Sequence, residues 1–112
     1  MRCAVLAILV GLATPAAAQP ADVVATGSLL AGCQSLVENA PSGNMMQMGA
    51  CAGAVSAALD ISRALRQSCP PGEVGVIDVA RRIVMFVDER PARQADQFGP
   101  LVLTALRDRW PC

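Results

Sequence analysis

The apolar positions of this chain recur at three- and four-residue steps, the spacing that places side chains on one face of an α-helix. The most regular stretch is rich in alanine, begins at Met45 and ends near Gln67. Its predicted buried face comprises Met48, Ala52, Val55, Leu59, Ser62 and Leu65. A second face carries Gly49, Gly53 and Ala57. Because glycine inside a helix costs about 1 kcal/mol relative to alanine, we expect this flat face to admit another helix at close range.

Three further segments show the helical spacing, from Asp22 to Glu38, from Glu73 to Glu89, and from Phe98 or Pro100 to Arg109. The first two open on an acidic residue, which suits the positive N-terminal end of a helix. The predicted buried face of the third helix comprises Val76, Ile77, Ala80, Ile83, Val84 and Val87, and that of the last comprises Leu101, Val102, Ala105 and Leu106.

Turn-forming residues separate these segments. Residues 39–44 contain proline, glycine and two asparagines, and Pro70-Pro71-Gly72 follows the second helix. The connection from Arg90 to Gln97 is polar, and no strand pattern, long linker or repeat appears in the sequence. We therefore predict an all-α fold, a small four-helix domain whose short connections make the helices mostly antiparallel.

The N-terminal residues have the organisation of a secretory signal peptide. A basic start at Arg2 precedes an apolar run over residues 3–12, and Ala16-Ala17-Ala18 fits the small-residue cleavage site. The apolar run is too short to span a bilayer core of about 30 Å. We therefore expect residues 1–18 to be removed, residues 19–112 to form a single all-α domain in the periplasm, and no membrane segment to remain.

Four cysteines follow the predicted cleavage site, namely Cys33, Cys51, Cys69 and Cys112, and an even count in a short exported chain indicates two disulfides. Cys51 and Cys69 bracket most of one helix, so a rise of about 1.5 Å per residue separates them by roughly 27 Å. A disulfide tolerates only about 7 Å between α-carbons. Cys33 and Cys51 lie on either side of the first turn and would face each other, so the predicted pairs are Cys33–Cys51 and Cys69–Cys112. The alternative, a four-thiolate zinc site, lacks the paired short spacings of such sites.

The composition excludes several classes of function. The sequence contains no histidine, lysine or tyrosine, so no Cys–His or Ser–His nucleophile can be assembled. Asp88 and Glu89 are adjacent and would point about 100° apart on a helix, which favours surface ion pairs over a general acid–base pair. Charges balance to zero and form no basic stripe, which argues against nucleic-acid binding. We expect a protein that is not an enzyme and has no catalytic residue, cofactor or metal.

A set of residues spread over nearly the whole predicted mature chain carries a family resemblance. They are Leu29-Leu30 with Cys33, Cys51-Ala52-Gly53, Asp60, Cys69 with Pro71-Gly72 and Val74, Arg90-Pro91, Leu101-Val102, Ala105-Leu106 and Trp110-Pro111-Cys112. In these features the chain resembles the Rap/Tai-type immunity proteins, which protect bacteria from peptidoglycan amidase effectors delivered by type VI secretion. Two positions depart from the family pattern, Ala54 where an aromatic residue is usual and Arg90 where a histidine is common. The resemblance implies an exported, non-catalytic protein that binds and inhibits a cell-wall amidase.

An inhibitor of this kind needs a protruding surface, and connections between rigid helices supply such surfaces. Residues 39–44 and 90–97 both qualify. We rank the second higher as a partner contact because it is longer, is polar and bears Arg90, Arg93 and Asp96, and because arginine is favoured in binding hot spots. The competing interpretation is an ordinary solvated connection.

The competing functional hypothesis is a periplasmic stress chaperone or general binding module. Such a protein would expose apolar surface, and Met45-Met46-Gln47-Met48 could supply it because methionine adapts to varied partners. The simpler interpretation is a helix start that packs its methionines inward. The sequence leaves the identity of the partner and the oligomeric state open, with a homodimer among the options.

Overall fold

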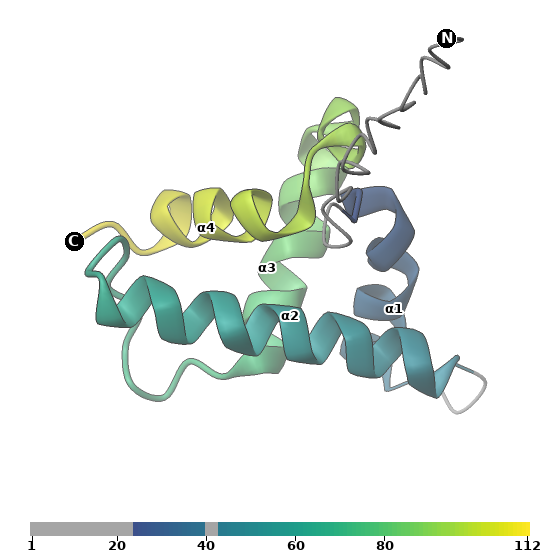
Figure 1. Cartoon of the computed structure of the whole chain (residues 1–112), viewed down its shortest axis with the longest axis horizontal. Coiled ribbons are helices and arrows are strands. Elements are labelled where there is room, and N and C mark those ends of the chain that lie inside the picture. The colour runs from purple at the N-terminus through teal and green to yellow at the C-terminus, as the bar shows by residue number, and fades with distance from the viewer. Residues whose placement is uncertain (1–23, 40–42) are drawn as a thin grey trace, which may run out of the picture.

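The computed structural model describes residues 24–39 and 43–112. Within them the chain forms four α-helices and one 3-10 helix (Figure 1), which are α1 Thr26–Glu38, α2 Met45–Ala64, α3 Val76–Glu89, η1 Pro91–Ala95 and α4 Phe98–Arg109. The predicted all-α, four-helix fold is thus confirmed. The predicted signal peptide at residues 1–18, the expected helix start at Asp22 and the middle of the first turn at residues 40–42 lie outside the described residues.

The first helix begins at Thr26, later than predicted, because the residues before it pair with the start of α4. Ala25 forms an isolated antiparallel bridge with Gln97. The backbone N–H and the Oγ1 hydroxyl of Thr26 both donate to the carbonyl of Asp96, at 2.8 and 2.9 Å. The N–H of Phe98 donates to the carbonyl of Val24 at 3.0 Å. This pairing ties together two segments that lie about seventy residues apart in the sequence.

The central helix is capped at its start and ends earlier than predicted. The side chain of Asn44 accepts hydrogen bonds from the N–H groups of Met46 and Gln47, which satisfies two of the free donors of the first turn. The helix ends at Ala64 because Arg66 adopts a left-handed conformation with φ of 52°. The break leaves Leu65 65% exposed, so its predicted burial is wrong.

The third helix also starts later than predicted. It begins at Val76, after Gly75, whose N–H donates to the carboxylate of Asp78 at 3.0 Å. Glu73 lies before the helix, so Asp78 rather than Glu73 places negative charge in the first turn.

The core contains one buried face from each α-helix. The face predicted for α4 is confirmed, and Phe98 joins it. On α3 the prediction holds for Ala80, Ile83 and Val87, whereas Ile77 is exposed. The buried apolar residues are Leu30, Cys33, Cys51, Val55, Ala58, Leu59, Val79, Ala80, Ile83, Phe86, Val87, Phe98, Leu101, Val102, Ala105 and Leu106.

The close approach between helices occurs at a glycine other than the predicted ones. A Cβ atom added at Gly32 of α1 would lie 2.6 Å from the carbonyl carbon of Gln47 in α2, a backbone atom that cannot swing away. Among the described residues, nothing lies within 4 Å of a Cβ added at Gly49 or Gly53. The prediction that Gly49, Gly53 and Ala57 admit a neighbouring helix is therefore wrong, and all three face outward.

Both predicted disulfides are present. Cys33–Cys51 joins α1 to α2 with α-carbons 5.3 Å apart, and both cysteines are fully buried. Cys69–Cys112 joins the α2–α3 connection to the C-terminus with α-carbons 4.8 Å apart, and both cysteines are exposed. The pairing uses all four cysteines as disulfides, so they do not form the alternative four-thiolate site.

The prediction that the helices are mostly antiparallel is wrong. Cys69 follows the end of α2 and Cys112 follows the end of α4, and their disulfide joins those two ends. Figure 1 shows α2 and α4 running in the same direction, with α1 and α3 lying across them. A short connection brings consecutive helix ends together, but the packing of side chains decides the crossing angle.

Candidate partner-binding surface

The polar connection that was ranked as a partner contact is an ordered segment. Its residues form η1, which begins at Pro91 and follows directly on the end of α3. The carbonyl of Asp96 holds the start of α1 through the two hydrogen bonds of Thr26. The segment is therefore fixed at both ends by the helices that flank it, and its side chains are presented from a defined backbone.

The structure places Arg90 and Arg93 over one buried aromatic ring, and Asp96 beside Arg93. The guanidinium carbons of Arg90 and Arg93 lie 4.3 and 5.8 Å from the centroid of the Phe86 ring, and Phe86 is 2% exposed. Arg93 also donates to the carboxylate of Asp96 at 3.2 Å. The two arginines thus cover a core residue while their charged ends face solvent, an arrangement that limits their rotamers before any partner arrives.

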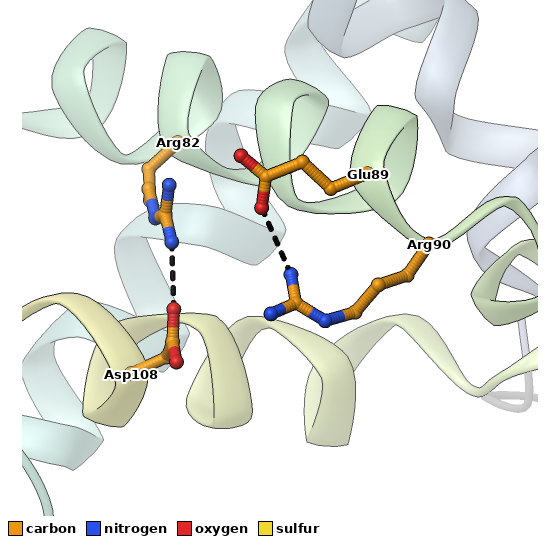
Figure 2. Close-up of polar contacts among 4 residues, drawn as sticks. All are labelled: Arg82, Glu89, Arg90 and Asp108. Atoms are coloured by element: carbon orange, nitrogen blue, oxygen red, sulfur yellow. Dashed lines mark hydrogen bonds and ion pairs between the residues drawn. The ribbon is translucent and has the colours of Figure 1, made fainter.

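Arg90 lies along the seam between α3 and α4. Figure 2 shows its side chain extending between the two helices, where the guanidinium donates to Glu89 at 3.0 Å. Arg82 of α3 and Asp108 of α4 form a second ion pair on the same seam, at 2.6 Å. The predicted use of the Asp88-Glu89 carboxylates in surface ion pairs holds for Glu89.

Two shallow hollows flank this seam. The first has a volume of about 210 Å³ and is lined by Arg93, Asp96, Gln97, Pro100, Leu101 and Thr104. The second has a volume of about 320 Å³ and is lined by Asp78, Arg81, Arg82, Met85, Arg109 and Trp110. Sequence reasoning missed the second hollow because its residues come from α3 and from the C-terminal end of α4. The adjacent arginines at positions 81 and 82 were the one local signal for it.

The outer face of α2 is apolar and exposed. Met45 and Met46 are 79% and 83% exposed, so the interpretation that they pack inward is wrong, whereas Met48 is half-buried. Four-residue steps from Met45 pass through Gly49, Gly53, Ala57, Ile61 and Leu65, all of them exposed. Because each four-residue step turns about 40° around the helix, this row of exposed residues winds from Met45 on one side of α2 to Ile61 and Leu65 on the other.

The described part of the chain contains neither a cluster of potential metal ligands nor a helix that could span a membrane. Within residues 24–39 and 43–112, no group of three or more histidine, cysteine, aspartate or glutamate side chains is placed to hold a metal ion. None of the helices in the same ranges is both long enough and apolar enough to cross a bilayer.

The model of a protein family described as Rap1a immunity proteins matches residues 25–112, which include the described helices and both disulfides. No curated protein and no solved structure matches the chain.

Proposed function

Because this chain belongs to the Rap1a immunity protein family, we propose that it inhibits a peptidoglycan amidase effector delivered by type VI secretion. Membership of the family indicates a protein that binds a toxic effector, and the family match over residues 25–112 is the observation that carries the proposal. The identity of the effector as an amidase rests on the resemblance of the terminal Trp110-Pro111-Cys112 and of the cysteine framework to the Rap/Tai-type proteins.

Inhibition by this protein requires no catalytic group. A chain without histidine, lysine or tyrosine can still block an enzyme by covering its cleft with a rigid surface. The segment Arg90–Asp96 suits that task because its backbone is fixed by α1 and its arginines are held over Phe86. A surface ordered before binding loses less conformational entropy when the complex forms.

The proposed site of action is the periplasm, where an amidase meets the cell wall. Residues 1–18 have the organisation of a signal peptide, and two disulfides suit an oxidising compartment. The test is co-expression with a periplasm-directed amidase effector from the same strain. The full chain should prevent lysis, whereas a variant without residues 2–18 should fail to protect.

A binding measurement distinguishes direct inhibition of the amidase from indirect protection of the cell. Titration calorimetry of the purified mature chain against the amidase should show a saturable complex, and amidase activity on peptidoglycan should fall in proportion to the bound fraction. Absence of binding to every amidase effector of the strain would refute the proposal.

The exposure of Met45 and Met46 favours a second candidate function, a general binding module or stress chaperone. A chaperone should suppress the aggregation of several unrelated unfolded proteins. Met45→Gln together with Met46→Gln should then abolish the suppression, whereas neither substitution should alter the inhibition of an amidase through Arg90–Asp96.

A homodimer could instead use the exposed small residues of α2. Antiparallel contact of two α2 helices at this point would place Gly53 of one copy near Ala57 of the other. Light scattering with size-exclusion chromatography tests this. A Gly53→Arg variant should convert a dimer to a monomer, and a wild-type monomer at high concentration would exclude it.

A further inference from the structure

The second hollow, between α3 and the end of α4, combines three arginines with apolar side chains. Arg81 and Arg82 come from α3, and Arg109 comes from the last turn of α4. Met85 is 49% exposed at its edge, and the ring of Trp110 is half-buried. Arginine, tryptophan and methionine are enriched at the centres of protein interfaces relative to other protein surface.

The charges of the hollow are unevenly matched within the described residues. Arg82 is engaged by Asp108 at 2.6 Å, and Arg81 has a long contact of 3.6 Å with Asp78. The carboxylate of Asp78 also accepts the N–H of Gly75. Arg109 has no ion pair among the described residues and lies with its guanidinium carbon 5.7 Å from the centroid of the Trp110 ring. Within residues 24–39 and 43–112, three guanidinium groups therefore face two carboxylates, and no carboxylate of these residues is paired with Arg109.

The hollow adjoins the seam that Arg90 occupies. Figure 2 shows Arg82–Asp108 and Arg90–Glu89 on the same side of α3 and α4, so a partner that covers η1 can continue along the seam. The hollow suits a partner segment with two features. One is a carboxylate that Arg109 can bind with two hydrogen bonds, and the other is an apolar side chain next to it that packs on Met85 and Trp110.

We propose that this hollow docks an acidic segment of the effector, an aspartate or glutamate flanked by an apolar residue, with Arg109 as its charged contact. The proposal rests on the proposed function, because the occupant is the amidase itself. It extends the contact surface from Arg90–Asp96 to the C-terminal end of α4.

The chain provides a matched control on the same helix. Arg107 and Arg109 are both exposed, both lie in the last turn of α4 and both would place an unfavourable negative charge there when changed to glutamate. Arg109 lines the hollow and Arg107 does not. The pair Arg109→Glu and Arg107→Glu thus holds net charge and helix-dipole effects constant while only one variant alters the hollow.

The experiment measures the affinity of both variants and of Met85→Ser for the amidase that the wild-type chain binds. We expect Arg109→Glu to weaken binding by at least about tenfold and Arg107→Glu by no more than about threefold. Binding of the wild-type chain should weaken with added salt more steeply than that of Arg109→Glu. Met85→Ser should also weaken binding, without changing this salt dependence.

Equal loss of affinity in the two glutamate variants would overturn the proposal, since it would show a general charge effect. Full affinity in Arg109→Glu would also overturn the docking proposal. The proposed inhibition of an amidase would stand in that case if the wild-type chain still bound the enzyme. Failure of the wild-type chain to bind any amidase would overturn both. Thermal melts that match for the two variants establish that folding is not the cause of a difference.

Discussion

Two helical glycines of this protein should respond in opposite directions to the same substitution. Gly32 of α1 faces the backbone of Gln47, and a Cβ there would lie 2.6 Å from a carbonyl carbon and 3.0 Å from the Gln47 Cβ. Gly53 of α2 is exposed, and a Cβ there meets nothing within 4 Å among the described residues. Neither glycine has a positive φ, so alanine can adopt both backbone conformations.

The expected magnitudes follow from this difference. Alanine in place of glycine inside a helix gains about 0.5–1 kcal/mol, because the unfolded chain has less conformational freedom to lose. Gly53→Ala should show that gain. At Gly32 the gain is opposed by overpacking of a well-filled contact, which costs typically about 1–3 kcal/mol or more. Movement to relieve it is restricted by the Cys33–Cys51 disulfide next to Gly32, so we expect Gly32→Ala to be destabilising overall.

Urea unfolding of both variants measures the effect, with thermal melts as a second readout. A change of 1 kcal/mol should shift the melting temperature by about 4–8 °C in a domain of this size. The melting temperature of Gly32→Ala should therefore fall and that of Gly53→Ala should rise. The reasoning would be refuted if the two variants shifted alike, or if Gly53→Ala were the less stable. This replaces the expectation from sequence that the face with Gly49, Gly53 and Ala57 admits another helix at close range.

Three other outcomes are expected. Arg90→Ala and Arg93→Ala should each weaken binding to the cognate amidase by more than about 1 kcal/mol. Their melting temperatures should fall slightly, since each removes a cation–π contact with Phe86 worth about 0.5–1 kcal/mol, and unchanged affinity in both would place the interface elsewhere. When the protein is titrated with a thiol reductant and then alkylated and mapped by peptides, Cys69–Cys112 should be reduced before Cys33–Cys51. The reason is that the first pair is exposed and the second is fully buried, and simultaneous reduction would contradict this. Thr26→Val, which keeps the volume of the side chain, should unfold at lower urea than the wild type, since the lost hydrogen bond from Oγ1 to the Asp96 carbonyl contributes about 0.5–1.5 kcal/mol. Equal midpoints would show that the hydroxyl makes no net contribution.

The helices and the disulfide pairs were predictable because local rules govern them. Apolar spacing located all four α-helices, and the rise per residue of a helix excluded a Cys51–Cys69 bond. Helix ends were less predictable. The start at Thr26 depends on pairing with Asp96 and Gln97, a contact between distant segments that no local pattern reveals.

The surfaces were only partly predictable. Arg90, Arg93 and Asp96 could be identified as a group because they are close in sequence, but the placement of the two arginines over Phe86 depends on how η1 packs on α3. The hollow with Arg109 and Trp110 could not be foreseen, since its other wall comes from α3.

By itself the sequence determined where the four α-helices lie along the chain, the cysteine pairing and the family, because periodicity, spacing and residue identity are properties of the chain alone. The tertiary structure decided which glycine is crowded, which methionines are exposed and which direction each helix takes. Gly32 and Gly53 are alike in sequence terms, and only the backbone of Gln47 distinguishes them. Crossing angles and close contacts come from the simultaneous packing of several helices, so they belong to the assembled domain and to no single segment.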